Sequence, residues 1–237
     1  MDSGSKQKFM ALVVGAQLAG IIVVILMCVW MGKLQGGFGW GYKNDLKFNY
    51  HPLFMTIGLI YLYGNAMLVY RVFRNENKKL IKVLHMFMQL SALGFAIFAL
   101  TAVFSAHNDE GNANLYTIHG WIGLITVIMF SLQFVMGFVF YLFPGMSEAN
   151  KIWYMGSHRF WGVAIFCMAL ATALLGITEN TLFKVRDYKE RPPQSYVINF
   201  MGIFIIVFGW LVTYIVHKPE YQRETTHSEY TEQLQNE

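Results

Sequence analysis

The chain has 237 residues, of which 55% are hydrophobic and only 14% are charged, with a mean hydropathy of +0.40. A soluble domain carries about 25% charged residues, so the composition excludes an ordinary soluble fold. The net charge of +4 does not indicate a nucleic-acid partner, because the basic residues flank apolar segments.

Six apolar runs are long enough to cross the hydrocarbon core of a bilayer, which takes roughly 20 helical residues. Runs of this length without alternating polar faces predict membrane helices rather than barrel strands. The first run is too long for a signal peptide and has no cleavage site after it. In chain order the runs are Phe9 to Met31, Phe48 to Tyr70, Leu80 to Phe104, Leu115 to Phe143, Ile152 to Thr178 and Tyr196 to Val216.

These runs predict an all-α membrane protein with one six-helix domain over residues 9–216. A short N-terminus, residues 1–8, precedes it, and a polar, disordered tail, residues 217–237, follows it. Because the number of spans is even, both termini lie on one side of the membrane. Placing that side in the cytosol gives it eleven of the 18 Lys and Arg residues, including the cluster from Arg71 to Lys82. The positive-inside rule therefore predicts cytosolic termini.

Four histidines lie one to a run in the second to fifth runs, at ends that alternate along the chain. His51 and His119 share a depth near the noncytosolic face, whereas His85 and His158 share a depth near the cytosolic face. Ionisable side chains inside a membrane are costly and indicate function. One helical turn from each face of a core of about 30 Å leaves the two levels roughly 20 Å apart. Two bis-histidine haems, one above the other, require this arrangement.

The surroundings of these histidines favour haem. Gly123 and Gly162 follow His119 and His158 by one turn, and a missing side chain there makes room for a flat macrocycle. Glycines also mediate ordinary helix packing. The chain has no Cys-x-x-Cys-His motif, so any haem is bound noncovalently.

Two further features have more than one interpretation. His107, predicted just past the third helix, is either a solvated loop histidine or a substrate contact. The basic cluster anchors the chain to anionic lipid headgroups or binds a small anion beside the cytosolic haem, and from the residues alone lipid anchoring is favoured for most of its members. The cluster comprises Arg71, Arg74, Lys78, Lys79 and Lys82.

Five short motifs of the chain point to a known family. The main one is Ala-Met-Leu-Val-Tyr-Arg-Val-Phe-Arg, from Ala66 to Arg74. The others are Tyr-Thr-Ile-His-Gly-Trp (Tyr116 to Trp121), Phe-Asn-Tyr-His-Pro (Phe48 to Pro52), Lys-Val-Leu-His (Lys82 to His85) and Thr-Ala-Leu-Leu-Gly (Thr172 to Gly176). These motifs resemble signatures of the cytochrome b-561 family of ascorbate-dependent transmembrane reductases. The resemblance covers about residues 36–216 and is strongest to the animal secretory-vesicle members.

The resemblance implies a homodimer in a secretory-vesicle or other endomembrane, in which helices two to five of each chain form a central four-helix bundle with two b haems. His51 and His119 would ligate the noncytosolic iron, and His85 and His158 the cytosolic iron. Cytosolic ascorbate would donate the electron. Its implied site comprises Arg71, Lys78, Lys79 and Lys82, to which Lys151 adds a further cation.

On the far side the resemblance implies an acceptor near His107 and Tyr116, either the monodehydroascorbate radical or a ferric chelate. Asp109 and Glu110 add oxygen ligands suited to ferric iron, whereas the vesicle-type resemblance favours monodehydroascorbate, with ferric reduction as a secondary activity. There are departures from the family pattern. Gly120 replaces a serine, Gln89 stands where some animal members carry histidine, and Lys151 alone replaces an arginine-rich stretch before His158.

The leading hypothesis is therefore an ascorbate-dependent transmembrane oxidoreductase. One alternative is a haem-free, histidine-based metal transporter, which should carry carboxylates at the membrane midplane, where none of the six runs has Asp or Glu. The other is a cytochrome subunit that anchors a partner dehydrogenase, which would not need a cationic donor site. The visible spectrum before and after addition of ascorbate distinguishes the three.

Overall fold

The computed structural model describes residues 1–42 and 44–223, and within them it contains helices and no strands. The long helices are α1 (Ser3–Val29), α4 (Lys78–Glu110), α5 (Ile118–Tyr141), α6 (Glu148–Lys184) and α7 (Pro193–His217). The shorter α-helices are α2 (Tyr50–Met55) and α3 (Tyr63–Val72). Two π-helical segments, η1 (Trp30–Leu34) and η3 (Thr56–Leu62), and three 3-10 segments, η2 (Asp45–Asn49), η4 (Tyr188–Glu190) and η5 (Pro219–Tyr221), complete the elements.

The predicted six membrane helices are confirmed among the described residues, since six helical spans are long and apolar enough to cross a bilayer. The second span is assembled from η2, α2, η3 and α3 in sequence. Several spans extend beyond the predicted runs. The third begins at Lys78 rather than Leu80 and the fifth at Glu148 rather than Ile152. Hydropathy marks the part of a helix that lies in lipid and not its polar ends, which explains the difference.

Both ends of the predicted domain need correction. The first helix begins at Ser3, not Phe9. The predicted disordered tail is wrong for its first residues, because α7 includes His217 and η5 follows it. Tyr221 is only 2% exposed and packs on Phe9, with ring centres 4.8 Å apart. Residues 224–237 of the predicted tail lie outside the described residues.

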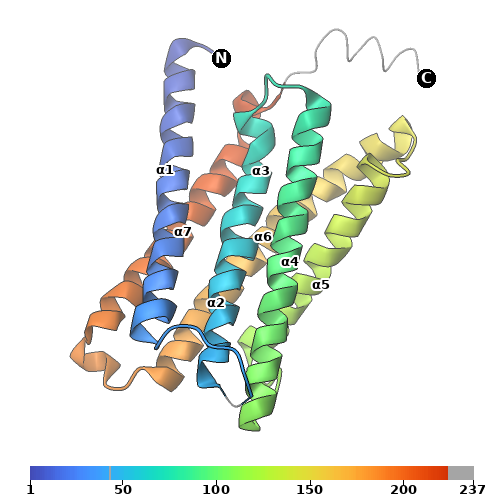
Figure 1. Cartoon of the computed structure of the whole chain (residues 1–237). Coiled ribbons are helices and arrows are strands. Elements are labelled where there is room, and N and C mark those ends of the chain that lie inside the picture. The colour runs from blue at the N-terminus through green and yellow to red at the C-terminus, as the bar shows by residue number, and fades with distance from the viewer. Residues whose placement is uncertain (43, 224–237) are drawn as a thin grey trace.

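The start of α1 and the end of α7 lie at the same end of the molecule, the upper end in Figure 1. α1 packs along α7, and α7 in turn contacts α3 and α6. α5 packs against α6 and α4, and α4 packs along the whole second span. The four spans that carry the singled-out histidines are therefore neighbours, and α1 and α7 flank them on one side (Figure 1).

Helix ends are fixed by local caps and by one long-range contact. Asn77, Thr117 and Ser147 each accept a backbone N–H with the side chain at the start of α4, α5 and α6, which satisfies donors that a helix leaves unpaired. At the other end of the chain, the Arg71 guanidinium donates to the carbonyls of Val216 and Lys218. A cation at the C-terminus of a helix stabilises its dipole, so Arg71 anchors the end of α7 to α3.

A polar cluster joins α1 to the second span inside the apolar part of the fold. Gln17 Nε2 donates to Asn65 Oδ1 over 2.5 Å, and Tyr61 Oη donates to Gln17 Oε1 over 3.3 Å. Gly20 makes the close approach feasible, because a Cβ there would lie 2.8 Å from the Tyr61 ring. Side-chain hydrogen bonds and small residues are the usual means of joining helices in lipid.

Candidate functional site

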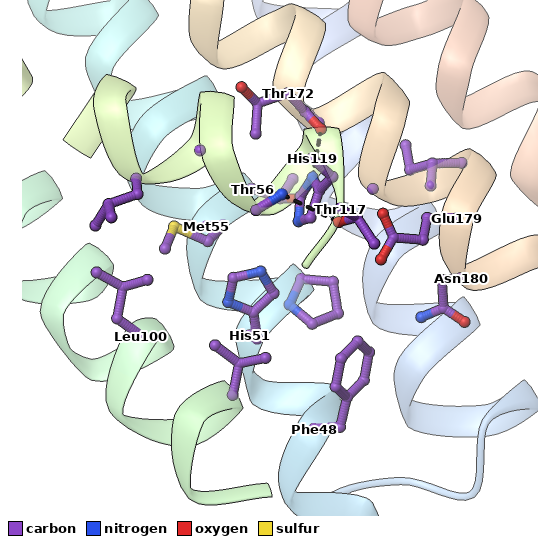
Figure 2. A pocket seen from close by; sticks show the side chains of 18 of the residues that line it. Phe48, His51, Met55, Thr56, Leu100, Thr117, His119, Thr172, Glu179 and Asn180 are labelled. Atoms are coloured by element: carbon purple, nitrogen blue, oxygen red, sulfur yellow. Dashed lines mark hydrogen bonds between the residues drawn. The ribbon is translucent and has the colours of Figure 1, made fainter. Parts of the chain in front are cut away.

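The first histidine pair consists of His51 on α2 and His119 at the start of α5, and α2 lies toward the lower end of the molecule in Figure 1. The ring centres are 6.1 Å apart. His51 Nδ1 lies 3.3 Å from the carbonyl oxygen of Ala99, and His119 Nδ1 lies 3.0 Å from that of Thr172. Both rings line a cavity of about 440 Å³, and Figure 2 shows them turned toward the same space.

The second pair lies toward the opposite end and consists of His85 on α4 and His158 on α6, with ring centres 6.4 Å apart. His85 Nδ1 lies 2.8 Å from the carbonyl oxygen of Ala66. His158 differs from the other three, because its Nδ1 faces the side chain of Gln133, whose Nε2 lies 3.0 Å away and also donates to the His158 carbonyl over 2.7 Å. Tyr154 Oη donates to Oε1 of the same Gln133 side chain.

The separation of the rings fits one metal ion between each pair. Metal–nitrogen bonds to histidine are about 2.0–2.1 Å, so two imidazoles on opposite sides of one ion have ring centres about 6 Å apart. In three of the four histidines Nδ1 faces a backbone carbonyl, which accepts the Nδ1–H and orients an imidazole that binds metal through its other nitrogen. Among the described residues no third His, Cys, Asp or Glu joins either pair. A metal ion without a porphyrin would need more protein ligands than two histidines. In a haem the porphyrin supplies the four remaining nitrogen ligands.

Two buried polar atoms in the wall of the cavity also indicate a bound group. Trp30 Nε1 and Asn180 Oδ1 have no hydrogen-bond partner in the described part of the chain, and both residues line the cavity of the first pair. Buried polar groups are normally satisfied. The cavity volume also falls within the range of about 300–1,000 Å³ that is usual for ligand pockets. The residues present therefore fit a haem at the first pair.

The vertical separation of the pairs can be followed along two helices. His85 contacts Ala66 and His119 contacts Thr172. Ala66 is roughly fifteen residues from His51 on the second span, which is about 22 Å at 1.5 Å per residue, and Thr172 is similarly far from His158 on α6. This agrees with the roughly 20 Å predicted from the sequence. α4 and α6 begin two to three turns before His85 and His158, so both helices continue past these residues toward that end of the molecule.

Two glycines that sequence reasoning did not single out make room for the histidine rings. A Cβ on Gly176 of α6 would lie 2.6 Å from the His119 ring, and a Cβ on Gly137 of α5 would lie 3.2 Å from that of His158. The predicted Gly123 does line the cavity. Gly162 instead offers its carbonyl to Tyr63 Oη over 2.8 Å. The signal for Gly176 was its place in the Thr172 to Gly176 motif.

The two predicted acceptor-side residues, His107 and Tyr116, line the same cavity as the first pair. His107 is not in a loop as expected, since α4 continues to Glu110 and Gly111 ends it with a φ of 73°. The His107 ring is half-buried and stacks on Phe48, with centres 6.2 Å apart and planes 16° apart. Tyr116 is 60% exposed.

The carboxylates at this mouth are in different environments. Asp109 forms an ion pair with Lys47, which is only 4% exposed and also donates to Ser105 Oγ over 3.0 Å. Its charge is therefore balanced within the protein. Glu110 is exposed and lines the cavity, as does Glu179 on the α6 side, where Figure 2 shows Glu179 above Asn180.

At the opposite mouth, two predicted donor-site lysines lie close to the second pair. Lys82 Nζ donates to the Tyr141 carbonyl over 3.1 Å, and Tyr141 Oη donates to the Lys151 carbonyl over 3.2 Å. The Tyr141 ring is 5.6 Å from that of His158. Lys78 and Lys79 are exposed at the start of α4, whereas Arg71 is held at the end of α7.

One cation at this mouth was missed as a site residue. Arg159 follows His158 directly, is exposed, and interacts electrostatically with both Arg71 and Tyr141. Its position in the sequence, directly after the predicted ligand His158, could have identified Arg159 as a site residue. The mouth of the second pair is therefore surrounded by cations from three spans.

Paired imidazoles at two levels of a six-helix bundle define a class of membrane protein, the oxidoreductases that hold haem between helices. Comparison with known proteins agrees. Residues 50–184 match the family model of eukaryotic cytochrome b561. The chain belongs to this family, which confirms the predicted membership. Membership implies b-type haem. The protein is therefore a transmembrane oxidoreductase.

Similar relatives cover most of the chain. The transmembrane ascorbate-dependent reductase CYB561 of Homo sapiens is 42% identical over 209 residues, which span 88% of this chain and 82% of the relative. That of Mus musculus is 40% identical over the same length, with 88% and 83% covered. The plasma membrane ascorbate-dependent reductase CYBRD1 of Xenopus laevis is 38% identical over 221 residues, with 92% and 78% covered.

Proposed function

We propose that the protein transfers electrons from cytosolic ascorbate, through two b haems, to an acceptor on the far side of the membrane. The observation that carries the proposal is the pair of imidazole couples, each contributed by two different helices, at levels about 22 Å apart along the spans. A single couple would serve a membrane cytochrome of any kind. Two at opposite ends make a path across the bilayer.

His51 and His119 would hold the noncytosolic haem, and His85 and His158 the cytosolic one. The haems supply one-electron redox chemistry, and the protein supplies ligation, orientation and insulation. Contacts of Nδ1 with Ala99, Thr172 and Ala66 leave the other ring nitrogen for iron. The apolar helices keep water away from the path.

The donor site is proposed at the mouth of the second pair, with Lys82 and Lys151 as its inner members and Arg71, Lys78 and Lys79 around them. Support comes from Lys82 Nζ, which donates to the carbonyl of Tyr141, whose ring lies beside that of His158. The Lys151 backbone carbonyl accepts from Tyr141 Oη, whereas Lys151 Nζ is paired with Glu148 over 2.5 Å. Ascorbate is an anion, and clustered cations raise its local concentration. Arg71 also donates hydrogen bonds to the end of α7, so it would serve both the donor site and the packing of α7.

The acceptor site is proposed at the mouth of the first pair, where His107 and Tyr116 line the cavity. The Lys47–Asp109 ion pair bears on which acceptor is used. Because Asp109 is balanced by Lys47, it neither repels an anionic radical nor offers a free carboxylate to ferric iron. This favours monodehydroascorbate as the main acceptor, with a ferric chelate as a secondary one.

Orientation and assembly belong to the same proposal. Eleven of the 18 Lys and Arg residues lie in the termini and in or near the loops on their side of the membrane. This excess supports cytosolic termini by the positive-inside rule. The resemblance to vesicle-type members suggests a homodimer in a secretory-vesicle or other endomembrane. A metal transporter without haem is disfavoured, because no group of three metal-binding side chains occurs among the described residues.

The visible spectrum tests the proposal. Purified protein should show b-type haem bands that ascorbate reduces, with two haems per polypeptide. His85→Ala and His158→Ala should each remove one haem and leave the other. His217→Ala is the matched control, since His217 is exposed at the end of α7. A haem content unchanged in the His85 and His158 variants would reject the ligand assignment, and a protein without haem would reject the function.

A further inference from the structure

Three buried aromatic rings from three helices lie between the histidine pairs: Tyr63 of α3, Phe130 of α5 and Phe166 of α6. They are 2%, 2% and 0% exposed. The Tyr63 ring centre is 4.9 Å from that of Phe130 and 5.5 Å from that of Phe166, with planes 65° and 75° apart. These are favourable edge-to-face contacts. Tyr63 is the central ring of this aromatic layer.

The layer lies about one helical turn from residues that line the first pair's cavity. Ile60, Val127 and Ala169 line that cavity, and each is three residues, or about one helical turn, from a ring of the layer. Ile60 precedes Tyr63, Val127 precedes Phe130, and Ala169 follows Phe166. The three helices therefore present their aromatic residues at one common depth, immediately above the space assigned to the noncytosolic haem.

Tyr63 is also joined to the second pair. Its hydroxyl donates to the Gly162 carbonyl over 2.8 Å, and Gly162 is one turn from His158 on α6. Along its own helix, Tyr63 is one turn from Ala66, whose carbonyl contacts His85 Nδ1. The same side chain thus lies one turn from a residue that lines the first cavity, one turn from the residue that contacts His85, and in hydrogen-bond contact with a residue one turn from His158.

We infer that Tyr63, with Phe130 and Phe166 packed against it, is the bridge through which an electron passes between the two irons. The inference rests on the proposed function, because it requires both haems. Tunnelling falls exponentially with distance and falls faster across a void than through packed atoms. With both haems bound, one electron would leave the cytosolic iron and reach the noncytosolic iron, so that oxidation of the first would balance reduction of the second.

Tyr63 itself keeps its electrons and its proton in this step. Its hydroxyl donates to a backbone carbonyl, which is too weak a base to take the phenolic proton, so a neutral tyrosyl radical has no route of formation. The aromatic ring rather than the hydroxyl is therefore the coupling element. Tyr63→Phe should keep the coupling, whereas replacement by an aliphatic side chain should weaken it.

The test compares ring-free and ring-retaining variants in the full-length protein with both haems bound. Tyr63→Met removes the ring with a flexible side chain that fills irregular space, and Tyr63→Leu is a second ring-free variant. Tyr61→Met is the matched control. Tyr61 is two residues away on the same span, but it faces α1 through Gln17. The readouts are haem per polypeptide, the two midpoint potentials, and the inter-haem transfer rate after a light pulse that injects one electron.

The expected result is a several-fold or greater slowing of inter-haem transfer in Tyr63→Met, with haem content and potentials as in the parent. Tyr63→Phe and Tyr61→Met should transfer at the parent rate. Parent rates in a ring-free variant that retains both haems would overturn the inference, and so would equal slowing by Tyr63→Phe. Loss of a haem from both ring-free variants would also overturn it, by giving Tyr63 a packing role. A parent protein with fewer than two haems would instead reject the proposed function.

Discussion

Gly176 shows how much one missing side chain can decide at the residue scale. A Cβ at this position would lie 2.6 to 3.2 Å from three atoms of the His119 ring, and contacts under 3.0 Å force something to move. The ring is also held by its contact with the Thr172 carbonyl on the same helix. Moving the ring away from the new Cβ would lengthen that contact, so α6 both shapes and orients this proposed ligand.

Gly176→Ala should therefore reduce occupancy of the noncytosolic haem while leaving the cytosolic haem in place. Gly156→Ala on the same helix is the matched control, because a Cβ there meets nothing within 4 Å. Haem per polypeptide, measured with the reduced spectrum, checks the result. Two haems in Gly176→Ala would show that the His119 ring is free to adjust and that the glycine is dispensable.

Lys82 supports a second residue-scale prediction, on the donor side. Lys82→Ala should slow haem reduction by ascorbate without changing haem content, because the cation contacts the carbonyl of Tyr141, whose ring lies 5.6 Å from that of His158. Reduction of the parent should weaken with salt, since exposed charges are screened over about 8–10 Å. Lys6→Ala, which removes a charge at the N-terminal end of α1, should reduce at the parent rate. Stopped-flow rates equal in all three proteins would favour lipid anchoring.

Arg71 illustrates, at the scale of elements, how one side chain joins two helices. Its guanidinium on α3 donates to carbonyls at the end of α7. Arg71→Gln should lower the free energy of unfolding by about 1.5–3 kcal/mol, the usual contribution of hydrogen bonds that involve a charged group. Arg186→Gln, at an exposed position after α6, is the control for loss of charge. Thermal unfolding in detergent checks the prediction, and equal midpoints would mean that α7 does not depend on Arg71.

Hydropathy and spacing along the chain predicted the six spans, their order and the pairing of the four histidines, because these properties are local and each helix reverses direction. They did not predict Gln133 beside His158 or Gly176 beside His119. Those contacts depend on how α5 and α6 are rotated against each other, which no local pattern records. The ordered His217–Tyr221 segment was missed for a similar reason, since Tyr221 is buried by packing on Phe9 at the other end of the chain.

For the whole molecule, orientation decides which mouth meets which substrate. The structure places the start of α1 and the end of α7 at one end (Figure 1), and the basic residues predict that this end is cytosolic. A protease-cleavable tag after Glu237 should resist external protease in intact cells and be cleaved only after the membrane is permeabilised. Ready cleavage in intact cells would exchange the donor and acceptor assignments.

The central claim is that electrons cross the bilayer through both histidine pairs, and transfer across a sealed vesicle tests it directly. Vesicles containing the protein and loaded with ascorbate should reduce a membrane-impermeant ferric chelate or externally generated monodehydroascorbate. Vesicles with the His85→Ala or His51→Ala variant, and vesicles without protein, should not. No reduction by parent protein that retains both haems, or equal reduction by a variant that lacks one haem, would contradict the account.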